Sequence, residues 1–418
     1  MSIAQHCNVN SMHSKVKVGR LPLVIIGQYV PTSGLTCVMQ NLIAHLKDKF
    51  DISVIGLCYD GPPFVDGAKT YPDILNRRPD GSQLELEEFL SAAAAKIALL
   101  FHDLPVQPGL LNRLEAAKCH PKIVTYTAVD GNVIEDDLLW RLGTAERSVF
   151  STEFGRSQAA KFIGQRKLAV IPLGVDTNLF YPYSGSVAEQ FEGSKRRNAR
   201  RVLFGDQSDL LDAFIVLNGN RPWLRKRIDL TVEGFALFAR NKPASVKLYL
   251  HHARTSEFER RQVFRMARRW NIVDRLIVNP MLDGKSEVSN EQLNLLYNSC
   301  DVGINTSMGE GWGLVSFEHA ATGAPQIVPR HSACSEIWQD AANFLEPNKR
   351  DIFLCAPHCE MEAISPDDVA NILERLYQEP DYRRNMALAA YRRVTEPRFR
   401  WPSIANQWVA LFDEIVDT

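Results

Sequence analysis

A short segment in the second half of the chain constrains the fold most strongly. Residues 301–325 read DVGINTSMGEGWGLVSFEHAATGAP, where an apolar run at 302–305 predicts a buried strand and a helix is expected from Leu314. The turn between these two elements contains three glycines, Gly309, Gly311 and Gly313. Such a turn presents unpaired backbone N–H groups at the positive end of a helix, which suits a phosphate group.

Two glutamates flank this turn. Glu310 lies within it, and Glu318 lies one to two turns into the expected helix. Because an ionised carboxylate only accepts hydrogen bonds, these side chains suit hydroxyl groups rather than phosphate. A phosphate held by backbone N–H groups, next to hydroxyls held by two carboxylates, together describe a nucleotide-sugar.

Composition indicates a globular protein without a strongly charged partner. The chain has 418 residues, 45% hydrophobic and 23% charged, with a formal net charge of −1. No global basic field argues for nucleic acid or an anionic membrane, although peripheral membrane contact and the oligomeric state stay open. The N-terminal stretch shows no apolar core of a signal peptide and the eight cysteines are scattered, so we expect a cytoplasmic protein with reduced thiols.

One cluster contains three potential metal ligands, Cys355, His358 and Cys359. Three ligands within five residues do not easily converge on one ion without a fourth from elsewhere. We therefore expect neither a metal nor a cofactor.

Strand-like and helix-like segments alternate along the chain, which predicts parallel sheets covered by helices. Two doubly wound domains facing each other leave a cleft between the carboxyl ends of their strands, where ligands bind in such sheets. The polar stretch at 183–201 has its basic residues at 195–201, and it is interpreted as a solvated segment between the domains or a solvated helix face rather than a nucleic-acid or lipid patch. The expected parts are a disordered N-terminus at 1–16, a first domain at 17–180, a linker at 181–204, a second domain at 205–395 and a terminal helix at 396–418.

A basic group directly follows the strand expected at 213–217. Arg221 offers a rigid fork of donors and Lys226 a point charge, a pairing that suits a diphosphate. When a sugar–phosphate bond breaks, negative charge grows on the leaving diphosphate, and two fixed cations can stabilise it without a metal. A further turn at 27–34 places Gly34 at a helix start, where a backbone can approach a ligand closely.

From about Leu21 onward, the chain resembles the retaining, GT-B-fold glycosyltransferases of family 4. Glu310 and Glu318, with seven residues between them, match the paired-glutamate motif of that family. Arg221 and Lys226 match its diphosphate-binding basic pair, and residues 170–182, VIPLGVDTNLFYP, resemble its inter-domain segment.

The resemblance implies an α/β fold of two Rossmann-like domains, with a C-terminal helix that crosses back to the first. It implies that Glu310 contacts hydroxyls of the donor sugar near the reacting carbon, and that Glu318 accepts hydrogen bonds from the ribose. The backbone N–H groups offered to sugar and phosphate would come from Gly311, Trp312, Gly313 and Leu314. Two interpretations of the Trp312 ring stay open, because it either walls the sugar pocket or packs under the loop.

The implied activity moves a hexosyl group from a nucleoside-diphosphate sugar to a hydroxyl acceptor, with retention and without a metal. The acceptor is a glycan, a lipid-linked sugar or a metabolite. In the hypothesised front-face displacement, the diphosphate held by Arg221 and Lys226 helps to take the acceptor proton. Two alternatives remain: a GT-B-like sugar epimerase or phosphorylase, and a non-catalytic sugar-nucleotide-binding protein.

The chain departs from the family pattern on the acceptor side. Many members carry a histidine at the end of an N-domain strand, whereas residues 125–131 read TYTAVDG here. Asp130 therefore either orients or deprotonates the attacking hydroxyl, or it caps a helix that starts near Asn132. His102, at another expected strand end, either faces the acceptor or is structural.

Overall fold

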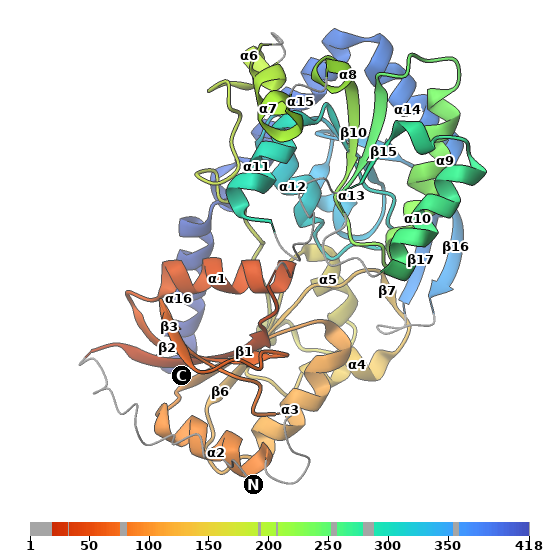
Figure 1. Cartoon of the computed structure of the whole chain (residues 1–418). Coiled ribbons are helices and arrows are strands. Elements are labelled where there is room, and N and C mark those ends of the chain that lie inside the picture. Colours follow the sequence, from red (N-terminus) through yellow and green to blue (C-terminus); the bar gives the residue numbers. More distant parts are fainter. Residues whose placement is uncertain are drawn as a thin grey trace, which may run out of the picture.

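The structure is a computed structural model of the 418-residue chain, and it describes residues 19–31, 33–75, 82–190, 194–205, 208–251, 257–278, 288–353 and 359–417. The predictions made for residues 1–16, and for Cys355 and His358 as metal ligands, fall outside these residues. The chain folds into two domains, each centred on a parallel sheet, and its last helix lies against the first domain (Figure 1).

In the described residues, the first domain contains an eight-stranded sheet in the order β3-β4-β2-β1-β5-β6-β8-β9. β3 pairs antiparallel with β4, and the other pairs are parallel. The strands are β1 Leu21–Gln28, β2 Phe50–Leu57, β3 Phe64–Asp66, β4 Ala68–Tyr71, β5 Ile97–Phe101, β6 Lys122–Thr127, β8 Arg147–Phe150 and β9 Leu168–Val170. The helices are α1 Gly34–Leu46, α2 Ser82–Ala92, α3 Gln107–Ala116, α4 Asp136–Leu142 and α5 Glu153–Ala159.

Both faces of this sheet are buried. Leu23 and Ile25 of β1 belong to one hydrophobic cluster, whereas Val24 and Ile26 belong to another. Successive side chains of a strand point to opposite faces, so the continuous apolar run of β1 fills two cores at once, as expected for a parallel strand covered by helices.

The described part of the second domain repeats the pattern with a six-stranded parallel sheet in the order β12-β11-β10-β13-β14-β15. The strands are β10 Phe214–Asn218, β11 Val246–Leu250, β12 Leu276–Val278, β13 Val302–Ile304, β14 Gln326–Pro329 and β15 Asn343–Leu345. The helices after the first domain are α6 Val187–Gln190, α7 Ser194–Phe204, α8 Ser208–Leu211, α9 Ile228–Ala239, α10 Glu257–Arg269, α11 Asn290–Ser299, α12 Leu314–Ala321, α13 Ser332–Trp338, α14 Pro366–Gln378, α15 Pro380–Val394 and α16 Trp401–Asp417.

Helix α16 crosses back to the first domain, as the sequence predicted. Its apolar stripe packs edge-on against first-domain rings, with 4.9 Å between the ring centroids of Trp408 and Tyr126, and 5.4 Å between those of Phe412 and Phe50. Among the described residues, no helix is both long enough and apolar enough to span a bilayer.

A small antiparallel sheet joins the two domains. Its strands are β16 Pro347–Phe353, β17 Cys359–Ile364 and β7 Asn132–Val133, in the order β16-β17-β7. β7 comes from the first domain, so strand pairing crosses the domain boundary at Cys359 and Val133. This sheet was not predicted from the sequence.

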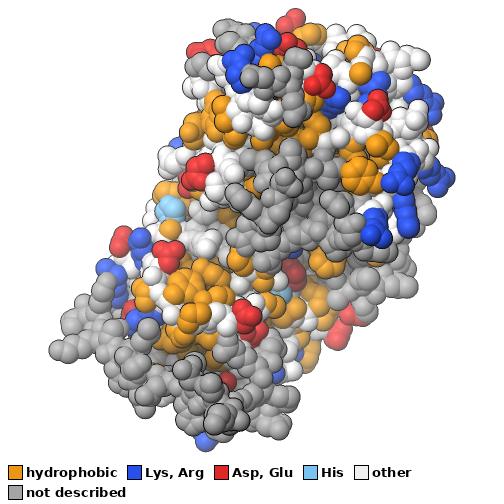
Figure 2. Space-filling view, viewed as in Figure 1, with side chains coloured by type: hydrophobic (Ala, Val, Ile, Leu, Met, Phe, Trp, Pro, Cys, Tyr) orange, Lys and Arg blue, Asp and Glu red, His pale blue; other side chains and the backbone are white. Residues whose placement is uncertain are grey.

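The basic stretch at 195–201 is helical, as one of its interpretations has it, but two of its side chains are not solvated. It forms part of α7, whose Arg196 and Arg200 are buried and both pair with Asp301 of the second domain. Asp301 compensates the cost of burying these two guanidinium groups, because a buried guanidinium needs a carboxylate and further acceptors. On the face shown in Figure 2, basic side chains gather around α9 and α10, while acidic and basic side chains are interspersed elsewhere.

Candidate active site

Four of the predicted site residues, Asp130, Lys226, Glu310 and Gly311, come together where loops of the two domains meet. The loop after β13 carries Glu310, and it meets the loop after β6, which carries Asp130. At Gly311 an added Cβ would lie 2.7 Å from the Cβ of Ala128, so glycine permits this close approach between the domains. The seam continues at α5, whose first N–H groups, from Glu153 and Phe154, are capped by the second-domain carboxylate of Glu336.

Glu310 is buried and held on all sides. One carboxylate oxygen, Oε1, pairs with Lys226 Nζ and accepts hydrogen bonds from Asn305 Nδ2 and Ser307 Oγ, each at 2.9 Å. Its side chain is 4% exposed and that of Lys226 is 13% exposed. Burial by itself would raise the pKa of Glu310, but Lys226 and Arg225 outweigh it and hold that pKa at about 2. Glu310 is therefore an ionised acceptor.

The backbone around Glu310 is fixed by the start of α13. Ser332 Oγ accepts from the Glu310 N–H at 3.2 Å and lies 3.1 Å from the Glu310 carbonyl oxygen, to which it donates. His331 Nε2 lies 2.8 Å from the carbonyl oxygen of Ser307. These hydrogen bonds tie the glutamate loop to the start of α13, and neither Ser332 nor His331 was predicted as a site residue.

Arg225 contacts both domains and was not singled out from the sequence. Its Nη1 donates to the Gly309 carbonyl at 2.5 Å and lies 3.5 Å from Glu310 Oε2. Its Nε lies 3.2 Å from Asp130 Oδ2. The sequence signal was its place in the same basic run as Lys226.

Both carboxylate oxygens of Asp130 contact residues of the second domain. Its Oδ1 accepts from the Gly311 N–H at 2.8 Å, and its Oδ2 faces Arg225. Burial raises the pKa of Asp130 above its usual value, although Arg225 opposes this. The helix cap expected near Asn132 is wrong, because residues 132–133 form β7 and α4 begins at Asp136 after the N-cap residue Glu135.

Glu318 lies on α12, separate from the cluster around Glu310. Its Oε2 accepts a hydrogen bond from Tyr297 Oη at 3.1 Å. Burial raises the pKa of Glu318 to about 7, and the Tyr297 hydrogen bond only partly offsets this. The two glutamates of the motif therefore differ, because one is locked as an anion and the other titrates near neutrality.

The turn into α12 has the geometry expected of an anion site. Gly313 has a φ of 91°, in the left-handed region, and its successor Leu314 begins the helix. Gly34, which begins α1 of the other domain, faces this turn, with 3.0 Å between Leu314 Cδ1 and the position of an added Cβ. Trp312 is 3% exposed and packs edge-on against Phe317 and Phe399, which is the packing role left open above.

Two further predicted residues follow other strands of the two sheets. Arg221 is exposed in the loop between β10 and α9. His102 is buried at the end of β5, where its Nδ1 accepts from the Asp103 N–H at 2.8 Å, and burial lowers its pKa. Their functional roles stay predictions.

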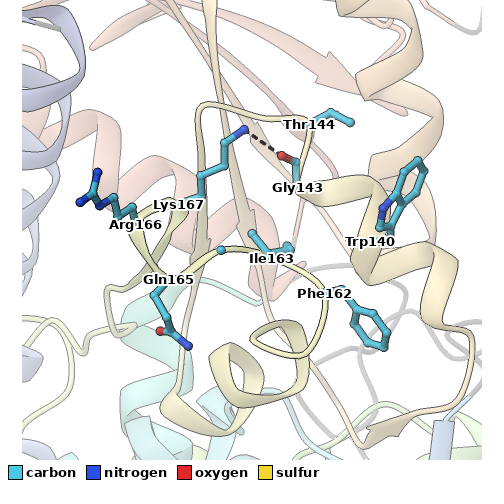
Figure 3. A pocket seen from close by; sticks show the side chains of 9 residues that line it. Trp140, Gly143, Thr144, Phe162, Ile163, Gln165, Arg166 and Lys167 are labelled. Atoms are coloured by element: carbon cyan, nitrogen blue, oxygen red, sulfur yellow. Dashed lines mark hydrogen bonds between the residues drawn. The ribbon is translucent and has the colours of Figure 1, made fainter.

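The described residues contain a surface hollow but no cluster of metal ligands. No group of three or more His, Cys, Asp or Glu side chains there could hold a metal ion. A surface hollow of about 500 Å³ lies on the first domain between the ends of α4 and α5 (Figure 3). Trp140 and Phe162 line it together with Arg166, and none of the predicted site residues does.

Known proteins match part of this sequence and almost the whole fold. Residues 242–410 match the family described as glycosyl transferase-like. An MMP α-(1→4)-mannosyltransferase from Mycolicibacterium hassiacum is 24% identical over 254 residues, which are 61% of this chain and 50% of that protein. The chain therefore spans about half the length of this curated relative.

Solved structures match almost the whole chain. A sucrose-phosphate synthase from Thermosynechococcus elongatus has a TM-score of 0.73 at 16% identity, covering 95% of this chain and 100% of that one. HepE from Anabaena, in complex with UDP-glucose, has a TM-score of 0.69 at 13% identity, covering 94% and 99%. The chain thus has the GT-B fold of glycosyltransferases, and residues 242–410 relate it by sequence to the glycosyl transferase-like family.

Proposed function

We propose that the protein transfers a hexosyl group from a nucleoside-diphosphate sugar to a hydroxyl acceptor, with retention of anomeric configuration and without a metal ion. The observation that carries the proposal is the buried anion of Glu310, which is paired with Lys226 in the loop before α12 and is followed by Gly311, whose N–H donates to Asp130 of the other domain. Carboxylates and cations arranged in this way can hold both a polyhydroxyl ring and a leaving diphosphate.

The donor is proposed to lie along the second domain. Its diphosphate sits at the amino end of α12, where backbone N–H groups and the helix dipole favour an anion, with Arg221 and Lys226 supplying positive charge. Glu318 is placed on the same helix to accept from the ribose hydroxyls, and Glu310 to accept from the sugar hydroxyls.

The proposed chemistry is a front-face displacement. The bond between the anomeric carbon and the diphosphate oxygen breaks, a bond from the acceptor oxygen forms on the same face, and the acceptor proton passes to the leaving diphosphate. Lys226 and Arg221 stabilise the charge that develops there. Contact between the two domains at Gly311 and Asp130 excludes water from the reacting atoms.

The acceptor is proposed to be a hydroxyl of a sugar, whether a glycan, a lipid-linked sugar or a metabolite. The names of similar proteins support a carbohydrate, since they include a mannosyltransferase and a sucrose-phosphate synthase. The HepE complex with UDP-glucose favours UDP-sugars as the donors to test first, and the mannosyltransferase favours including mannosyl donors.

A donor panel tests the proposal directly. UDP-, GDP- and ADP-sugars are screened by thermal shift, since a ligand that binds only the folded state raises the melting temperature. The donor that shifts it is then incubated with sugar acceptors, and the anomeric configuration of the product is read by NMR with and without EDTA. We expect acceptor-dependent release of the nucleotide, a retained anomer and no loss with EDTA.

Other results would point to the alternatives. Turnover of the donor with no acceptor, or with phosphate alone, indicates an epimerase or a phosphorylase. Binding of the donor without any product across the acceptor panel indicates a sugar-nucleotide-binding protein. Arg221→Ala is expected to cost about 3 kcal/mol of transition-state stabilisation, and unchanged kinetics would remove Arg221 from the site.

A further inference from the structure

The cluster at the cleft is balanced in charge before any ligand arrives. It contains two carboxylates, Asp130 and Glu310, and two cations, Arg225 and Lys226. A nucleoside diphosphate brings additional negative charge into this partly buried place. Some of the existing ion pairs must therefore rearrange when it binds.

Lys226 is the cation that must change partner. In the structure its Nζ is bound to Glu310 Oε1, and both side chains are largely buried. If Lys226 turns to the diphosphate, Glu310 loses its nearest counter-charge. A buried carboxylate left without a cation costs several kcal/mol, so the exchange needs a second cation close to Glu310.

Arg225 is in the right place to be that second cation. Its Nη1 is 3.5 Å from Glu310 Oε2, the oxygen that Lys226 does not hold. The same Nη1 donates to the carbonyl of Gly309, the residue before Glu310. The guanidinium therefore already touches both the backbone and the side chain of the glutamate loop.

Asp130 fixes this guanidinium from the other domain. Its Oδ2 is 3.2 Å from Arg225 Nε, and its Oδ1 accepts from Gly311, the residue after Glu310. Asp130 and Arg225 thus hold the backbone on both sides of Glu310. This part of the support exists only while the first and second domains are in contact.

We propose that Arg225 is a positioning residue that takes over Glu310 when Lys226 turns from that glutamate to the diphosphate, and that Asp130 orients Arg225 for this exchange. The inference rests on the proposed function, because it assumes a nucleoside diphosphate at this site. Asp130 then acts through Arg225 and is not the base that deprotonates the acceptor. Donor binding and domain contact become two parts of one exchange of ion pairs.

The exchange makes a prediction that a direct contact does not. Without Arg225, Lys226 stays on Glu310 and is less available to the diphosphate. R225Q should therefore weaken the binding of UDP or GDP, whichever the wild type binds, by about tenfold. Removing the charge of Glu310 as well frees Lys226, so R225Q/E310Q should bind within about threefold of E310Q.

Isothermal titration of UDP and GDP into wild type, R225Q, E310Q and R225Q/E310Q tests this. R225K is included because a lysine keeps the charge without the two-sided fork, and it should recover part of the affinity. R330Q is the matched control, since Arg330 is a half-exposed second-domain arginine paired with Glu346. It should bind the nucleotide as wild type does.

Two results would overturn the inference. One is an equal loss of affinity from R225Q in the wild-type and E310Q backgrounds, which means that Arg225 contacts the diphosphate itself or has only a structural role. The other is unchanged affinity in R225Q. If no nucleoside diphosphate binds wild type, the proposed function fails instead.

A ligand-free measurement covers that last case. Thermal unfolding of D130N, R225Q and the double variant should give a double-variant loss in melting temperature well below the sum of the two single losses. Additive losses would show that Asp130 does not act through Arg225, whatever ligand the site takes.

Discussion

Strand β13 has a buried acid–base cluster at each of its ends, and the two clusters are built differently. Asp301 directly precedes the strand and pairs with Arg196 and Arg200. Glu310 follows the strand and pairs with Lys226 and Arg225. Both carboxyl groups have a lowered pKa despite burial, because two cations face each of them.

The amino-end cluster is closed on itself. Asp301 Oδ2 also accepts from the Ile215 N–H at 2.7 Å, and Arg200 donates in addition to the carbonyls of Ser299 and Leu211. All of these groups belong to α7 and the second domain. The cluster fastens α7 onto the sheet and leaves no charge directed toward a ligand.

The carboxyl-end cluster is not confined to one domain. It lies before the amino end of α12 and includes a side chain of the other domain, and it is there that we propose an exchange of ion pairs. A lowered pKa therefore does not by itself mark a functional carboxylate. What distinguishes Asp301 from Glu310 is the end of strand β13 at which each lies, and whether the partners come from one domain or from two.

Asp301→Asn should have the largest effect, and on stability alone. Two buried guanidinium groups lose their shared counter-charge, so we expect the free energy of unfolding to fall by about 3–5 kcal/mol, measured by urea denaturation. Nucleotide affinity of the folded fraction should stay unchanged. A loss below about 1 kcal/mol would show that the amino-end cluster is not structural.

Glu310→Gln should show the opposite profile. Turnover should fall by about two to three orders of magnitude, corresponding to about 3–4 kcal/mol in the transition state, because a neutral amide replaces the anion that faces the sugar. The free energy of unfolding should fall by less than about 2 kcal/mol. A large loss of stability with residual turnover near wild type would make the two clusters equivalent.

Glu318 predicts a smaller, pH-dependent effect. Its pKa is raised to about 7 in the folded state from 4.5, so its stabilising contribution is complete below pH 4.5 and is lost as pH rises through about 7. After allowance for its partial exposure, we expect a loss of about 1–2 kcal/mol over this range. Glu318→Gln should flatten this slope in thermal unfolding between pH 5 and 8.

Nucleotide binding should follow the opposite direction at Glu318. An ionised carboxylate accepts from both ribose hydroxyls, so affinity should rise with pH through about 7 in wild type. The variant Glu318→Gln corrects for titration of the phosphate itself. If wild type and variant have the same pH profile, Glu318 does not hold the ribose.

Arg330→Gln should have the smallest effect. The Arg330–Glu346 pair is 46% and 61% exposed, so water screens it, unlike the two clusters beside β13. We expect a change in the free energy of unfolding below about 1 kcal/mol, measured in the same urea series. A larger change would show that exposure does not separate the ion pairs of this domain.

The second-domain motif could be predicted because its signals are local. The strand expected at 302–305 and the helix expected from Leu314 appear as β13 and α12. An apolar run, three glycines and an amphipathic helix carry this information within twenty-five residues. The terminal helix expected at 396–418 appears as α16 at Trp401–Asp417, and its return to the first domain was implied by the family resemblance rather than by a local pattern.

The rest depends on pairs that are distant in sequence. Arg196 and Arg200 read as a solvated basic stretch because their partner, Asp301, lies about a hundred residues further on. The contact between Asp130 and Arg225 crosses two domains, and β7 is two residues long. No local pattern encodes such contacts, so the acceptor side of the site was the part least visible in the sequence.

The strand ladder shared by β7 and β17 has a mechanical consequence. Two first-domain residues, Asn132 and Val133, pair with Glu360 and Cys359 of the second domain. Any separation of the lobes must either unzip this ladder or carry β16 and β17 along with the first lobe. On that side the two lobes share one sheet, so moving them apart requires that this sheet be broken or bent.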